Sequence, residues 1–192
     1  MVYNGIIEGQ YVTLRSVMVE DALFTLAIRQ DARLTEYLPK LDITLEQQVA
    51  WIKKQQKDPT DYFFVVWDKK EKPVGTIGVY HIEDGEGETG RLAMKGNPFQ
   101  AMEAQMLCAD FVFDTLCLKK LKSYIYAGNQ SAIRFSALFC PNLSKPYKNN
   151  QGELVHSTEN TKELYQVKRE ALQKILYRNK KVDIQSKADK EI

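Results

Sequence analysis

Residues 92–139 decide the fold of this chain, and they read LAMKGNPFQAMEAQMLCADFVFDTLCLKKLKSYIYAGNQSAIRFSALF. The stretch predicts, in order, an apolar strand at Leu92–Met94, a break at Gly96–Pro98, a long apolar helix, a strand at Lys120–Ala127 and a short helix led by Asn129. A strand that ends at a glycine and reopens as a helix presents free backbone N–H groups and the positive end of a helix dipole. This arrangement favours an anionic ligand such as a pyrophosphate.

The composition is that of an ordinary globular domain. The 192 residues are 44% apolar and 27% charged, which is enough for one domain with its own core. The formal net charge is +2 and the lysines are interleaved with acids, whereas a nucleic-acid-binding protein more often carries a dense basic stripe. No apolar run approaches the roughly 20 residues that span a bilayer. We therefore expect neither a nucleic acid nor a membrane as partner.

The three cysteines, Cys108, Cys117 and Cys140, lack the spacing of a metal site. Two of them have apolar neighbours, which is typical of buried free thiols. An odd number of cysteines without a signal peptide favours a reducing compartment. We expect a cytoplasmic protein with no bound metal.

Periodic and alternating apolar residues predict the elements of the first half. Thr44 and Gln47 have the spacing of a capping box at the start of a helix. Tyr62–Trp67 is a nearly continuous apolar run, which predicts a strand covered on both faces. The predicted elements are a strand at Tyr11–Arg15, helices at Glu20–Asp31 and Thr44–Lys57, a hairpin of Tyr62–Trp67 with Val74–Glu83, an acidic turn at Glu83–Thr89 and a strand at Gly90–Lys95.

The second half adds further helices. The one at Phe99–Thr115 is apolar almost all round, which is typical of a helix buried against a sheet. Asn129 or Ser131 caps the next helix, which runs through Leu138. The prolines and asparagines of residues 140–152 predict a long loop.

This order of elements predicts an α+β fold, in which one mixed central sheet carries helices on both faces. We expect a single domain over residues 1–179 and a polar C-terminal tail over residues 180–192. The end of the domain is ambiguous. Apolar residues at 164, 167, 171, 175 and 176 fit a helix from Lys162 to Asn179.

Several short motifs resemble one known family in their order and spacing. They are Tyr11–Arg15 followed by Glu20–Ala22, Trp51-Ile52, Pro73–Gly78, Phe111–Phe113 and Asn129–Arg134. Over roughly residues 9–175 the chain resembles the GCN5-related N-acetyltransferases, in particular the branch that acetylates ribosomal-protein N-termini and amino sugars. The resemblance also implies a final strand at about Glu163–Val167 with a helix after it, and we favour this interpretation of the last segment.

What the resemblance implies for function is specific. The acyl donor is acetyl-CoA, and the acceptor is a primary amine on a small molecule or peptide that attacks the thioester directly. The strand residues bind the pantetheine arm and polarise its carbonyl through backbone amides, the next loop and helix meet the phosphates, and a later asparagine approaches the cofactor. The corresponding residues are Leu92, Ala93 and Met94 on the strand, Lys95, Phe99, Gln100 and Ala101 in the loop and helix, and Asn129.

The phosphate loop of this chain departs from the family pattern. That pattern reads Arg or Gln, two residues, Gly, one residue, and Gly or Ala. Residues 95–104 contain a single glycine, the loop is several residues short, and Pro98 lacks an N–H donor. The amides of Phe99, Gln100 and Ala101 remain candidates to face an anion, whereas Glu103 near the same end is unfavourable for a phosphate.

Four residues are candidates for proton transfer: His81, Glu83, Glu88 and Ser136. His81 and Glu83 share a face of the predicted strand, and Glu88 lies in the acidic turn that follows. Ser136 aligns with the tyrosine that, in the family, protonates the leaving thiolate, and the Gly-Phe pair that follows is lost. The alternative is that the acidic residues form a solvated turn and that His81 is a surface histidine.

Two functions remain open at this point. The leading hypothesis is an N-acetyltransferase that acts on an amino sugar or a peptide N-terminus. Its rival is a non-catalytic descendant that keeps the fold for ligand or partner binding, as the altered loop and Ser136 would favour. We also weigh a homodimer, because exposed sheet edges favour association.

Overall fold

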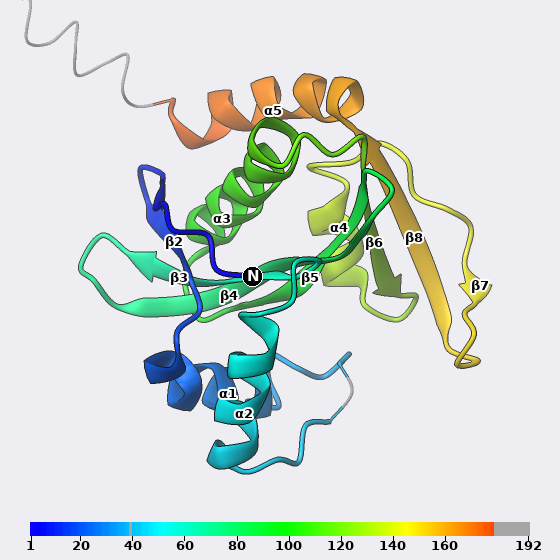
Figure 1. Ribbon diagram of the computed structural model, residues 1–192. Helices are drawn as coiled ribbons and strands as arrows, with labels where there is room; N and C mark the ends of the chain where they lie inside the picture. The colour runs from blue at the N-terminus through cyan, green and yellow to red at the C-terminus, as the bar shows by residue number, and fades with distance from the viewer. Residues whose placement is uncertain (39, 179–192) are drawn as a thin grey trace, which may run out of the picture.

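The computed structural model describes residues 1–38 and 40–178 and is built on one eight-stranded sheet (Figure 1). The strands lie in the order β1-β2-β3-β4-β5-β6-β8-β7. Their bounds are β1 Ile7–Glu8, β2 Val12–Ser16, β3 Tyr62–Asp68, β4 Pro73–Glu83, β5 Glu86–Met94, β6 Lys120–Tyr126, β7 Tyr147–Lys148 and β8 Leu154–Thr161. The helices are α1 Ala22–Gln30, α2 Leu45–Gln55, α3 Pro98–Asp110, α4 Gln130–Ser136 and α5 Lys162–Leu176, with a 3-10 turn at Val19–Asp21 and a π-helical turn at Phe111–Thr115.

The sheet is mixed, as the sequence predicts. Neighbouring strands are antiparallel except for β5 and β6, which run parallel and are joined by α3. Such a crossover needs a connection of a dozen residues or more, usually a helix. The quoted stretch from residue 92 to residue 139 therefore supplies the parallel pair, and the α+β fold class is confirmed.

Helices cover both faces of the sheet. In Figure 1, α3 and α5 lie over one face, and α1 and α2 lie over the other. On β3, Phe64 and Val66 are fully buried in the core with α3, whereas Phe63 and Val65 belong to a second core formed with residues of the α1 and α2 layer. Both faces of β3 are therefore covered, as its continuous apolar run predicts.

Local signals set most helix ends. The capping box of α2 forms as predicted, because Gln47 N–H donates to the Thr44 hydroxyl over 3.3 Å and Thr44 N–H donates to the Gln47 amide oxygen over 2.9 Å. Asn129, and not Ser131, caps α4, since its side-chain oxygen accepts the Ala132 N–H at 2.9 Å. Both caps satisfy amides that the helix itself leaves unpaired.

The prediction for the last segment was wrong. The final strand, β8, ends at Thr161, and the residues expected to form a strand at Glu163–Val167 lie in α5. The Thr161 hydroxyl accepts the Leu164 N–H, and Tyr165, Leu172 and Leu176 bury one face of the helix. The helical periodicity of this segment is confirmed. The final strand that the resemblance implied at Glu163–Val167 lies earlier in the chain, at Leu154–Thr161.

Two further expectations need correction. The acidic turn is confined to Asp84 and Gly85, so residues 86–89 belong to β5 and Glu88 is a strand residue. The segment at 140–152 contains the short strand β7 in addition to loop. The proposed tail at 180–192 lies outside the described residues. Within the described part of the chain, no helix has the length and apolar character to cross a membrane.

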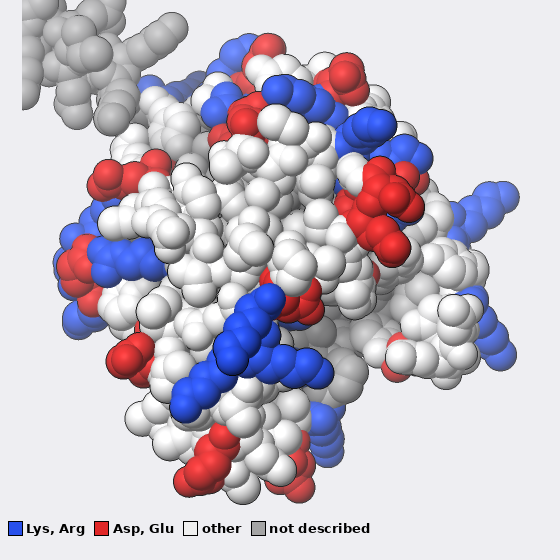
Figure 2. Space-filling view, viewed as in Figure 1, with Lys and Arg blue, Asp and Glu red and all other residues white. Residues whose placement is uncertain are grey.

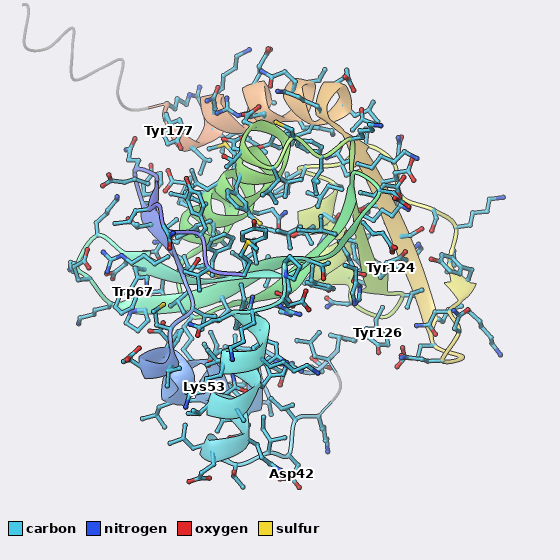
Figure 3. The ribbon with its side chains drawn as sticks, viewed as in Figure 1. Asp42, Lys53, Trp67, Tyr124, Tyr126 and Tyr177 are labelled. Carbon is cyan, nitrogen blue, oxygen red and sulfur yellow. The ribbon has the colours of Figure 1, made fainter. Side chains whose placement is uncertain are left out.

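Glu103 does not face an anion site. Its carboxylate is fully buried on the far side of α3 and accepts N–H groups from Gln10, Tyr11 and Val12 at 2.6–2.8 Å. The Tyr177 hydroxyl, at the C-terminal end of α5 in Figure 3, donates to the same group over 2.7 Å. The charge expected to repel a phosphate is therefore used to hold the chain leading into β2 against α3 and α5.

Candidate active site

The candidate site is a cavity of about 500 Å³ that opens where β5 and β6 separate. The parallel pairing begins at Glu86 with Lys120 and ends at Glu88 with Lys122, although β5 continues to Met94 and β6 to Tyr126. Beyond Glu88 the backbone of β5 therefore has no ladder partner on its β6 side. Backbone N–H and C=O groups are obligatory hydrogen-bonding groups, so this edge is suited to an extended ligand carrying amides.

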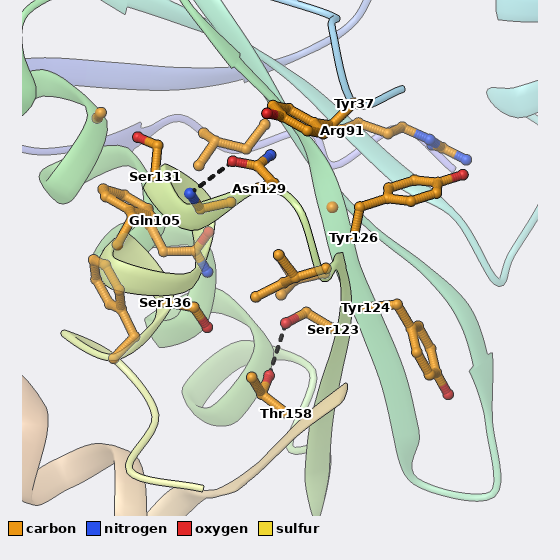
Figure 4. Close-up of a pocket in the computed structure, with 18 of the residues that line it drawn as sticks. Tyr37, Arg91, Gln105, Ser123, Tyr124, Tyr126, Asn129, Ser131, Ser136 and Thr158 are labelled. Carbon is orange, nitrogen blue, oxygen red and sulfur yellow. Dashed lines mark hydrogen bonds between the residues drawn. The ribbon is translucent and has the colours of Figure 1, made fainter. Parts of the chain in front are cut away.

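The walls of the cavity differ in chemistry (Figure 4). Ser123, Thr158, Gln105 and Ser136 lie on the side of β6 that faces α3 and α4, and the aromatic rings of Tyr37, Tyr124 and Tyr126 lie toward the other side of the sheet. Successive side chains of a strand point to opposite faces, so β6 separates the two walls by alternation. The apolar part of the lining comes mainly from Leu92, Met94, Ala101, Ala132 and Phe135.

A bulge in β5 shapes the aromatic side of the cavity. The register between β4 and β5 shifts between Thr76 and Gly78, and Arg91, in the extra segment, adopts φ of 55°. Its guanidinium forms two hydrogen bonds of 2.7 Å with the Asp61 carboxylate and lies 4.4 Å from the ring centre of Tyr80. A bidentate pair of this kind fixes a side chain more firmly than one hydrogen bond does. Arg91 is therefore held in place next to the cavity.

Glu88 lies at the last paired position before the strands separate. Its carboxylate accepts the Tyr80 hydroxyl at 2.8 Å and is 3.2 Å from Nδ1 of His81. Burial, and then the charge of Glu88, raise the pKa of Tyr80, which therefore stays a proton donor to the carboxylate. The pKa of Tyr124 is also raised, chiefly by burial and in part by the charges of Tyr147 and Glu88. Glu88 thus has fixed partners and an electrostatic effect on a cavity residue.

The opposite wall carries several hydroxyl groups. The Ser123 and Thr158 oxygens are 2.7 Å apart on the paired strands β6 and β8. Ser136, the last residue of α4, lines the same cavity. These groups can donate or accept a hydrogen bond by rotation about one bond.

The first turn of α3 is closed by its own side chains. The Gln100 N–H donates to the Asn97 side-chain oxygen over 3.1 Å, and the Asn97 N–H donates to the Gln100 amide oxygen over 2.9 Å. The Ala101 N–H donates to the Asn97 carbonyl over 3.1 Å, as in any regular helix. Three amides were expected to face an anion. Those of Gln100 and Ala101 already donate to Asn97, and the third, the Phe99 N–H, is not used by this cap.

The structure brings together part of the predicted site. Leu92, Met94, Ala101, Asn129 and Ser136 line the cavity. Glu88 and His81 contact each other, but neither lines the cavity, and His81 is an exposed residue as the alternative interpretation expected. Other predicted residues lie outside the lining: Glu83 at the exposed hairpin end, Ala93 buried opposite Thr76, and Lys95, Phe99 and Gln100 around the closed turn.

Sequence reasoning missed several lining residues. Ser123 alternates with Lys122 and Tyr124 in the strand predicted at Lys120–Ala127, but its contact with Thr158 depends on the register between β6 and β8. Gln105 and Tyr37 belong to none of the motifs in the sequence, so no local pattern predicts that they meet at the cavity. Only the strand alternation around Ser123 was a usable signal.

Comparison with known proteins defines the family. A model of the acetyltransferase (GNAT) domain matches residues 12–137, which is more than half of the chain. The chain therefore belongs to this family, whose members are acetyl-CoA-dependent N-acetyltransferases. The resemblance read from the sequence is thus confirmed at the level of the family and its acyl donor. No curated protein matches the chain.

Solved structures agree in fold. A GCN5-related N-acetyltransferase from Brucella melitensis superposes with a TM-score of 0.76 at 21% identity, covering 91% of this chain and 86% of that one. Apo FdhC, a nucleotide-linked sugar GNAT, gives 0.72 at 20% identity, covering 91% and 97%. Spermidine N-acetyltransferase from Vibrio cholerae in complex with CoA and spermine gives 0.70 at 15% identity, covering 82% and 99%. At these identities the likeness concerns the fold.

Proposed function

We propose that this chain transfers an acetyl group from acetyl-CoA to a primary amine of a small molecule or a peptide N-terminus. The observation that carries the proposal is the separation of β5 and β6 after Glu88 and Lys122, with a cavity of about 500 Å³ in the opening. The family supplies the donor, and the separated strands supply a place for the reacting carbonyl between the two walls.

The pantetheine half of the donor fits the cavity. Residues 89–94 have backbone groups without a ladder partner toward β6, and an amide-containing arm can complete those hydrogen bonds. Leu92, Met94 and Phe135 offer apolar contact to its alkyl parts. When bound, the donor supplies a thioester carbonyl, and free backbone N–H groups on β5 would polarise it.

The acceptor enters from the aromatic wall. Tyr37, Tyr124 and Tyr126 can stack on a sugar ring or contact a cationic amine. Structural relatives described as a nucleotide-linked sugar enzyme and a spermidine acetyltransferase act on such amines, which supports a small-molecule acceptor. The resemblance implied an amino sugar or a peptide N-terminus, and of the two the aromatic wall favours an amino sugar.

Glu88 is the proposed base. The attacking nitrogen must be neutral and must lose a proton as its bond to carbon forms. Among the predicted carboxylates, Glu88 lies closest in the chain to the separated backbone and acts on the pKa of Tyr124, whereas Glu83 is at the far hairpin end. A water between Glu88 and the amine would carry the proton, and His81 and Tyr80 hold the carboxylate in position.

Ser136 is the proposed acid. As the new C–N bond forms, the C–S bond breaks and the sulfur receives a proton. Ser136 lines the cavity on the wall opposite the tyrosines, next to the Ser123 and Thr158 hydroxyl pair. These hydroxyls can pass a proton from water to the leaving sulfur while none of them keeps a net charge.

A non-catalytic role is the second candidate. The observation that favours it is the self-capped first turn of α3, together with a serine at the position of the family's tyrosine. A descendant of this kind would bind a ligand in the cavity without transfer. The free cysteines Cys108, Cys117 and Cys140 fit our proposed cytoplasmic location, and a homodimer remains a prediction.

The test is acetyl transfer to a panel of amines. Wild-type protein would be incubated with acetyl-CoA and with amino sugars, polyamines or short peptides, and thiol release and the mass of each product would be followed. Ala132→Trp fills the cavity from α4, and Ala171→Trp on the exposed face of α5 is its matched control. We expect transfer by the wild type and the control and its loss in Ala132→Trp. Thiol release without an acetylated amine, or no release with any amine, would favour the non-catalytic role.

A further inference from the structure

The first turn of α3 is occupied by the protein itself. A capping box joins Asn97 and Gln100 in both directions, over 2.9 and 3.1 Å. Pro98 has no N–H to offer, and the Ala101 amide belongs to the helix. Phe99 is therefore the one residue of this turn whose amide neither the cap nor the helix satisfies.

The space beside Gly96, the single glycine of this loop, is also filled by a side chain. A glycine in such a loop leaves room for an anion, because it has no Cβ. At Gly96, however, the place of a Cβ is 2.4 Å from the side-chain oxygen of Gln100. That oxygen fills the space that the missing Cβ leaves, and as an acceptor it would repel an anion that approached there.

The nearest side chains do not replace the lost donors. Phe99 stacks on Tyr11, with ring centres 5.9 Å apart. Hydrogen bonds from Arg33, and to a lesser extent the charge of Lys95, lower the pKa of the Asp31 carboxyl, so both cations already have an acidic neighbour. A pyrophosphate at this turn would have to displace the Gln100 side chain and the Asn97 cap before it gained the amides beneath them.

Among the described residues, the part of the site offered to the pantetheine half of the donor shows no such competitor. The separated backbone of residues 89–94 and the apolar side chains of Leu92, Met94 and Phe135 face the cavity directly. Recognition of the pantetheine arm is therefore available without rearrangement, and recognition of the pyrophosphate is not.

We propose that this protein selects its acyl donor by the pantetheine arm, and that the nucleotide and its pyrophosphate add little. The inference rests on the proposed function and narrows its donor class to acyl-pantetheine thioesters, with or without the adenosine nucleotide. The capping box of α3 acts against the phosphate contact, because an N-cap side chain such as that of Asn97 is worth about a fivefold change in an equilibrium constant relative to alanine.

The experiment compares two acetyl donors and three ligands that carry no acetyl group. Calorimetric titration with CoA, pantetheine and adenosine diphosphate gives binding, and the kcat/KM for acetyl-CoA and acetyl-pantetheine gives use. We expect the two thiols, and the two thioesters, to agree within about tenfold, and we expect no binding of adenosine diphosphate at millimolar concentration. Acetyl-CoA preferred by more than about a hundredfold would overturn the inference and leave the proposed function standing. If neither thiol binds, both fail.

Variants of the capping box sharpen the comparison. Asn97→Ala removes the side-chain oxygen that competes for the Gln100 amide. We expect CoA to bind about fivefold more tightly to it, with pantetheine unchanged. Thr44→Ala removes the same kind of cap from α2 and should alter neither ligand. Weaker CoA binding to Asn97→Ala would mean that Asn97 contacts the donor, which contradicts the inference.

Discussion

At the scale of single residues, a buried polar side chain that belongs to no sequence motif joins distant parts of the chain. Glu103 is the clearest case, since its fully buried carboxylate accepts three backbone N–H groups that lie 91 to 93 residues away in the chain, together with one tyrosine hydroxyl. Sequence alone placed it near a phosphate. The partners that explain it are found only once β2, α3 and α5 are in place.

Glu103→Ala should lower the free energy of unfolding by about 3 kcal/mol or more, because it leaves several partly or fully buried N–H donors without an acceptor. Chemical denaturation monitored by circular dichroism measures the change. Glu170→Ala, an exposed glutamate on α5, should stay within about 0.5 kcal/mol of wild type. Equal loss in both variants would show that the network at Glu103 does not stabilise the fold.

Substitution of Ser136 can distinguish an effect on the catalytic step from an effect on substrate binding. If its hydroxyl protonates the leaving sulfur, Ser136→Ala should lower kcat about a hundredfold with little change in KM, and Ser136→Thr should retain most of the rate. Steady-state kinetics with acetyl-CoA and an identified amine measures both. An unaltered kcat in Ser136→Ala would assign the proton to water.

At the scale of elements, the periodicity of the residues predicts the helices and strands more accurately than the positions implied by the family resemblance. The apolar periods of α2, α3 and β3 and the capping box at Thr44 were read from the residues and are confirmed. The resemblance predicts the final strand too late in the chain, whereas the helical period of residues 162–176 predicts α5 correctly. The bulge at Arg91 was not foreseen, since it arises from the pairing of β4 with β5 and from the bond to Asp61.

A substitution on α5 tests the revised assignment. Ala171 lies mid-helix on the exposed face, so Ala171→Gly should lower the free energy of unfolding by about 1 kcal/mol through helix propensity alone. Thermal or chemical denaturation measures it, and Gln151→Gly in the exposed turn between β7 and β8 is the control with no expected loss. A neutral Ala171→Gly would argue against a stable helix there.

At the scale of the whole molecule, the site is a consequence of topology: a parallel pair inside a largely antiparallel sheet separates, and α3 and α4 close the opening from one side. On the face shown in Figure 2, basic and acidic side chains are interspersed. The stretch at residues 92–139 predicted the pair and both helices, but the meeting of Ser123 with Thr158, and the closed turn at Asn97, required the folded register.

Donor binding between β5 and β6 is tested most directly by calorimetric titration of acetyl-CoA into wild type, Ala132→Trp and Ala171→Trp. We predict micromolar binding by wild type and by Ala171→Trp, and binding weaker by at least about tenfold in Ala132→Trp, because the indole would fill the cavity. Equal affinity in all three proteins would place the donor elsewhere. No binding to the wild type at millimolar acetyl-CoA would contradict the acetyltransferase function itself.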